Sequence, residues 1–106
     1  MPAPPVFHDA LVRLRDALAF YRHAPHLAAT SMELEDGARS AARAGLEGGV
    51  PFAAVCAELG RAATESLAHD PLSAIGLGRV MTRWAAEVYH QHAMSGAGVA
   101  GRRASA

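Results

Sequence analysis

The chain has 106 residues and a mass of 11.0 kDa, the size of one domain and too short for two well-packed ones. Ten basic residues balance ten acidic ones. The resulting net charge of zero argues against a phosphate backbone or an anionic membrane surface as the partner. A single cysteine, Cys56, excludes an intrachain disulfide, and no zinc-finger spacing of Cys and His occurs.

The composition predicts one thin core. About half of the residues are apolar, but 25 of them are alanine, which buries little area. Burying a larger apolar side chain is worth roughly 1.5–3 kcal/mol, whereas ordering the backbone costs about 1–2 kcal/mol per residue. We therefore expect little surplus stability and a tendency to self-associate.

The N-terminus, MPAPPVFHDA, has neither the basic start nor the apolar run of a secretion signal, and no stretch of 18 apolar residues occurs. These features predict a cytoplasmic protein without a membrane segment. Because proline cannot enter a helix interior, we expect a flexible segment over residues 1–6 and a single helical domain over residues 7–94.

Apolar spacing of three and four residues predicts a first helix over residues 7–23, with the stripe Phe7, Leu11, Leu14, Leu18 and Tyr21. A second helix is expected over residues 31–46. Thr30 followed by Glu33 has the form of a capping box at its start, and Gly48 favours its end. One stripe of this helix consists mostly of small residues: Leu34, Ala38, Ala41 and Gly45.

A third helix is expected over residues 51–69, with Pro51 at its first position and the stripe Phe52, Val55, Cys56, Leu59, Ala63, Ser66 and Leu67. Asp70 and Pro71 indicate the start of a fourth helix over residues 71–94. Its expected stripe is Leu77, Val80, Met81, Trp84 and Val88. Residues 95–106 are small, polar and rich in glycine, which predicts a disordered tail.

The sequence shows no strand alternation and no internal repeat, so the expected fold class is all-α. Four helices joined by short loops favour a small antiparallel four-helix bundle, most simply with up-down-up-down topology.

Glu87 and His90 have the ExxH spacing that places a carboxylate and an imidazole on one helix face, as in carboxylate-bridged di-iron bundles. Such centres need a second ExxH, and no other glutamate is followed by histidine at this spacing. Arg83 lies four residues before Glu87. The favoured interpretation is therefore an ion pair on a solvated face.

An antiparallel bundle would gather the histidines in two groups, with His23, His26 and His69 at one end and His8, His90 and His92 at the other. Three imidazoles can bind zinc, nickel or copper, and can respond to pH near neutrality. Several of these histidines also lie in last helical turns, where a partly positive side chain complements the helix dipole. That role is favoured, and no cofactor is predicted.

The segment VPFAAVCAELG, residues 50–60, resembles the first helix and turn glycine of a helix-turn-helix DNA-binding motif. Val55, Cys56, Leu59 and Gly60 match that beginning. The following helix should supply apolar residues at set distances, but the chain has Arg61, Ser66 and His69 there. Glu65 and Asp70 also oppose contact with phosphates, so nucleic acid is not the expected partner.

No nucleophile with an assigned base points to an enzyme. We expect a non-catalytic interaction module, such as an accessory subunit, adaptor, chaperone or inhibitor, that binds a protein partner or forms a homo-oligomer. The residues predicted to let a partner helix approach closely are Leu34, Ala38, Ala41, Gly45, Gly76 and Gly78. The alternatives are a bundle that binds a metal or cofactor, through the histidines or Glu87 and His90, and a DNA-binding regulator.

Overall fold

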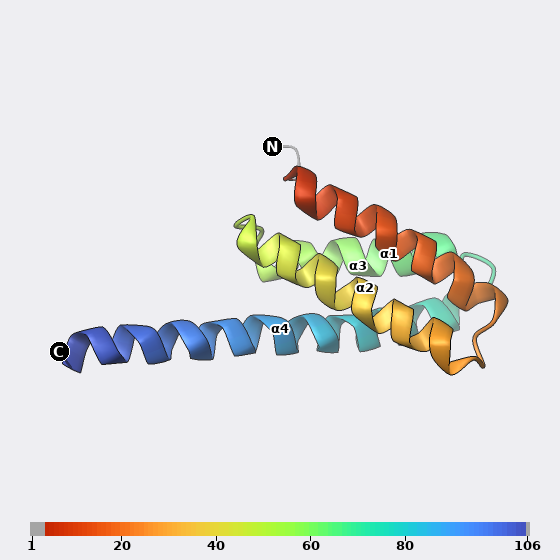
Figure 1. The fold of residues 1–106 in the computed structure, drawn as a ribbon. Coiled ribbons are helices and arrows are strands. Elements are labelled where there is room, and N and C mark those ends of the chain that lie inside the picture. Colours follow the sequence, from red (N-terminus) through yellow and green to blue (C-terminus); the bar gives the residue numbers. More distant parts are fainter. Residues whose placement is uncertain (1–3, 106) are drawn as a thin grey trace.

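The computed structural model describes the backbone of residues 4–105 and the side chains of residues 4–95, and this part of the chain is all-α. Its four helices are α1 (Pro5–His23), α2 (Ala28–Glu47), α3 (Phe52–Ser66) and α4 (Pro71–Ser105). Successive helices run in alternating directions (Figure 1). The predicted antiparallel four-helix bundle is confirmed.

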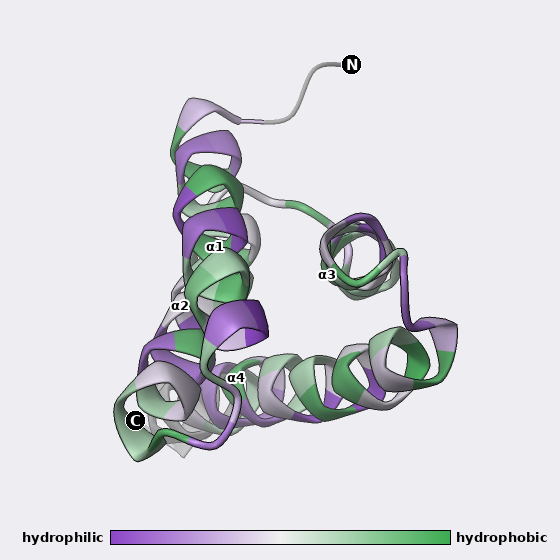
Figure 2. Ribbon diagram, turned by 90° about the vertical axis from the view of Figure 1, so that its right-hand side faces the viewer, coloured by the Kyte–Doolittle hydropathy of each residue, from purple (hydrophilic) through white to green (hydrophobic). Residues whose placement is uncertain are grey.

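Helix α1 packs against both α2 and α3, and so does helix α4. The consecutive helices α2 and α3 make less contact with each other, and α1 and α4 do not meet within the described residues. Figure 2 looks nearly along α3 and shows α1 and α4 on two different sides of it. The short connection between α2 and α3 therefore joins two helices that lie diagonally across the bundle.

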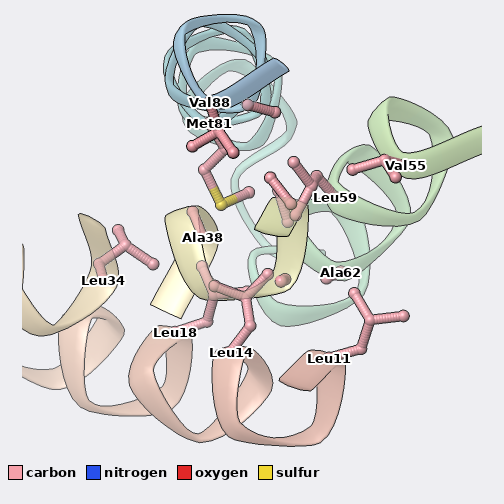
Figure 3. Packing of buried hydrophobic residues seen from close by; sticks show 14 of the residues in the cluster. Leu11, Leu14, Leu18, Leu34, Ala38, Val55, Leu59, Ala62, Met81 and Val88 are labelled. Atoms are coloured by element: carbon pink, nitrogen blue, oxygen red, sulfur yellow. The ribbon is translucent and has the colours of Figure 1, made fainter. Parts of the chain in front are cut away.

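The core is formed by apolar side chains from all four helices (Figure 3). Its largest fully buried members are Phe7, Leu14, Leu18, Leu34, Val55, Leu59 and Met81. Alanines fill much of the remaining space, and no polar or charged side chain is buried among the described residues. The stripe predicted for α1 is confirmed from Phe7 to Leu18. On α4 the core lies around Met81 and Ala85, whereas Val80, predicted to be inside, is exposed.

Gly45 lies at a tight contact of α2 with side chains of α1 and α3. A Cβ atom added there would lie 2.8 Å from Cγ2 of Val55 and 3.1 Å from Cε1 of Phe7. Real Cβ contacts are longer, so any side chain at this position would push α1 or α3 away from α2. Glycine is thus required by packing and not by backbone conformation.

The start of α2 differs from the prediction. The helix begins at Ala28, and Thr30 lies inside it. The Thr30 hydroxyl donates to the carbonyl oxygens of Ala24 at 2.7 Å and Leu27 at 2.9 Å. The predicted capping box is wrong, because the Thr30 hydroxyl donates to carbonyl groups before the helix instead of accepting from helical N–H groups.

The turn that ends α2 is a Schellman-type cap. The N–H of Val50 donates to the carbonyl of Gly45 at 2.8 Å, and that of Gly49 to Leu46 at 3.1 Å. Gly49 has φ = +77°, which glycine adopts without strain. The Tyr89 hydroxyl then donates to the Val50 carbonyl at 2.7 Å and so ties the turn to α4.

Asp70 caps α4 as predicted. Its carboxylate accepts from the N–H of Ser73 at 3.3 Å and from the Ser73 hydroxyl at 2.5 Å. The bounds of α4 are Pro71 and Ser105, and its last turns project beyond the other three helices in Figure 1.

The third helix is shorter than predicted. It begins at Phe52, with Pro51 as its cap residue, and ends at Ser66. Residues 67–69 form a turn instead of continuing the helix, which leaves the buried Leu67 as its C-cap residue.

We expect Gly45→Ala to destabilise the protein by about 1–3 kcal/mol, because the new methyl group overpacks the contact with Val55. Gly37→Ala in the same helix is the matched control. Its Cβ would lie 3.5 Å from Cδ1 of Leu14, an ordinary contact, so the better helix propensity of alanine should add roughly 0.5–1 kcal/mol. Urea denaturation followed by circular dichroism measures both, and equal effects of the two substitutions would contradict this packing.

The hydrogen bonds from Ser73 lower the pKa of Asp70 below its ordinary value. A depressed carboxyl pKa stabilises the folded state above the unfolded pKa, about 3.9, and that contribution is lost as the pH falls through the folded pKa. Asn caps a helix comparably but carries no charge. Wild type should therefore be more stable than Asp70→Asn at neutral pH, and thermal melts should show this difference vanishing below about pH 4. A difference independent of pH would contradict the assignment.

Candidate functional site

The histidines do not form a ligand set within the described residues. All six side chains are exposed, and no group of three His, Cys, Asp or Glu residues in this part of the chain is placed to hold a metal ion. The topology does bring the ends of α1 and α3 together, where Nη1 of Arg22 donates to the Ser66 carbonyl at 3.4 Å. His23, His26 and His69 are at this end, but their side chains do not converge on one point.

Glu87 joins α4 to α2. Its carboxylate accepts from Nη2 of Arg39 at 2.6 Å, and Nε of the same arginine donates to Glu35 at 2.9 Å. These bonds, chiefly that to Glu87, raise the pKa of Arg39. The solvated ion pair that the sequence predicted for Glu87 is therefore present, but its partner is Arg39 and not Arg83. His90 and His92 are exposed on the same helix and take no part in it.

We expect a double-mutant cycle of Arg39→Ala and Glu87→Ala to give a coupling free energy of at most about 1 kcal/mol, because both groups remain in contact with solvent. The coupling should fall as salt is added. Chemical denaturation of the four proteins at low and high ionic strength provides the values. A coupling of several kcal/mol, or one insensitive to salt, would mean that the pair is shielded from water.

The small residues predicted to bind a partner helix lie in two different environments. Leu34, Ala38, Ala41 and Gly45 are buried in the chain's own core, so the close helix approach that they permit occurs within one chain. They offer no surface to a partner in the folded monomer. Gly76 is exposed, and a Cβ added to Gly78 would meet only the backbone of Gly60 on α3, at 3.9 Å.

The turn needed for the helix-turn-helix resemblance is absent. Gly60 lies inside α3, which continues without a break from Phe52 to Ser66. A glycine in a helix interior costs stability but does not by itself end the helix. Cys56 on the same helix is half-buried, and burial raises the pKa of its thiol, which disfavours the nucleophilic thiolate.

One surface hollow lies where α1 and α3 meet the turn after α2. It has a volume of about 690 Å³, with Phe7 and Leu11 of α1 on one side and Pro51 and Ala54 on the other. Arg15 and Glu58 contribute charges to its lining. Sequence spacing could not reveal this hollow, because it depends on how α1 and α3 diverge in space.

A second hollow, of about 410 Å³, lies between α3 and α4. Its lining consists of Gly60 and Thr64 of α3 and Ala74, Ile75, Gly78, Arg79 and Thr82 of α4. On the same helix Leu72 is 82% exposed and Ile75 54% exposed. The first half of α4 is thus apolar on its outer as well as its inner side. The sequence contained this signal, since Arg79 is the only charged residue between Pro71 and Met81.

No protein family, curated protein or solved structure matches this chain. Within the described residues no helix is long and apolar enough to cross a membrane. What the chain does must therefore be inferred from its own surface.

Proposed function

We propose that the chain is a non-catalytic protein-interaction module that self-associates. The observation that carries this proposal is the pair of large apolar side chains left exposed on the first half of α4, where Leu72 is 82% exposed and Ile75 54% exposed. Large apolar side chains that lie together on a surface mark interaction sites.

Exposed apolar side chains are available to be buried in an interface between copies. Several large ones remain more than half exposed, namely Val6, Phe20, Met32, Leu72, Ile75 and Met94. Single exposed apolar residues are common on protein surfaces, but contiguous ones mark interaction sites. Leu72 and Ile75 are contiguous, because residues three apart are neighbours on a helix.

Native mass spectrometry of the untagged full chain, taken from lysate, tests this function. We expect a mass of two or more copies, or a complex with another protein, and no bound metal in stoichiometric amount. A monomer that carries no other protein would contradict the proposal. A stoichiometric metal or cofactor would favour the alternative of a metal- or cofactor-binding bundle, for which His90→Ala with His92→Ala is the variant to examine.

A further inference from the structure

The outer side of α4 carries a protruding side chain next to a hollow. Leu72 stands 82% exposed in the first turn of the helix. About one turn further along, the hollow of about 410 Å³ opens between α3 and α4, with glycine from each helix in its lining. A protrusion and a hollow on one face make that face complementary to a copy of itself, as a two-fold symmetric interface requires.

The positions along α4 fit one antiparallel pairing. If two α4 helices run antiparallel about a point between Ala74 and Ile75, Leu72 of one copy is level with Leu77 of the other. The α4 residues that line the hollow extend from Ala74 to Thr82, so this level lies within the hollow. The same register places Ile75 of each copy close to the two-fold axis, so the two isoleucine side chains would bury apolar area against each other.

The charges fit the same register. Asp70 of one copy becomes level with Arg79 of the other, so each end of the contact pairs opposite charges. Arg79 has no ion-pair partner among the described side chains. The methylene groups of Arg79 can cover Leu72 of the second copy while its guanidinium stays in water. A net charge of zero also means that two copies do not repel each other at long range.

We propose that two copies of this chain pair through the first half of α4, with Leu72 of each inserted into the hollow between α3 and α4 of the other. This rests on the proposed self-association and names its surface. The partner is a second copy, because the protrusion, the hollow and the two charges are matched within a single chain.

Two variants test the contact from opposite sides. Leu72→Glu removes the protrusion, and a carboxylate in the first turn of a helix favours folding. Gly60→Met fills the hollow, and a Cβ at Gly60 would meet no atom within 4 Å, so α3 can accept it. The matched control is Met32→Glu, which changes a side chain that is 66% exposed on α2 and is not among the residues that line the hollow.

Sedimentation velocity of the full chain over a range of micromolar concentrations measures the dissociation constant. We expect a dimer for wild type and for Met32→Glu. Each of the other two variants should weaken it by about 100-fold or more, because symmetry removes two buried leucine contacts at once. Circular dichroism of each variant should match wild type.

A wild-type dimer that both folded variants leave intact would overturn this contact while the proposed function stands. A wild-type monomer bound to a different protein would overturn both this contact and the proposed self-association, and would leave only the protein-interaction role. A wild-type monomer bound to nothing would overturn the contact and the proposed function.

Discussion

The bundle depends on how closely three helices can approach α2. The inner face of that helix carries one large side chain, Leu34, and otherwise alanines and Gly45. With so little side chain between them, α1 and α4 pack directly on α2, and Phe7 and Val55 reach the Gly45 backbone. The core therefore combines large buried side chains, which come mostly from the other three helices, with close packing against the small residues of α2.

That packing has a consequence for the surface. Many of the small residues are buried in the core, and several larger apolar side chains remain exposed, most clearly on the first half of α4. A helix that is apolar on both sides is ordinarily covered on both. The fold covers only the inner side of this segment, so an added partner would bury apolar area on the outer side.

Much of the fold could be predicted from the sequence because local signals agree with the packing. The stripe from Phe7 to Leu18 gave the inner face of α1, and Asp70 with Pro71 gave the start of α4. The capping box predicted at Thr30 was wrong, because a hydroxyl near a helix start can donate to a loop carbonyl as well as accept from the helix. Gly60 did not end the third helix, which continues through it as the prediction of a helix over residues 51–69 required.

The candidate sites were harder to predict, because they depend on pairs of helices and not on one. Arg39 and Glu87 are 48 positions apart, and only the contact of α2 with α4 brings them together. The hollow between α3 and α4 likewise needs Gly60 and Gly78 to be on facing helices. Spacing within one helix could identify the small residues, but it could not tell which of them the chain's own core would bury.

The central claim is that the inner face of α2 serves the chain itself while the outer face of α4 is left for a second copy. The most direct measurement is a dilution series of two-dimensional amide NMR spectra. We predict that signals from residues 70–82 and from the neighbourhood of Gly60 shift as the protein is diluted, while those from residues 34–45 stay constant. Shifts along residues 34–45, or a spectrum that dilution leaves unchanged throughout, would contradict the claim.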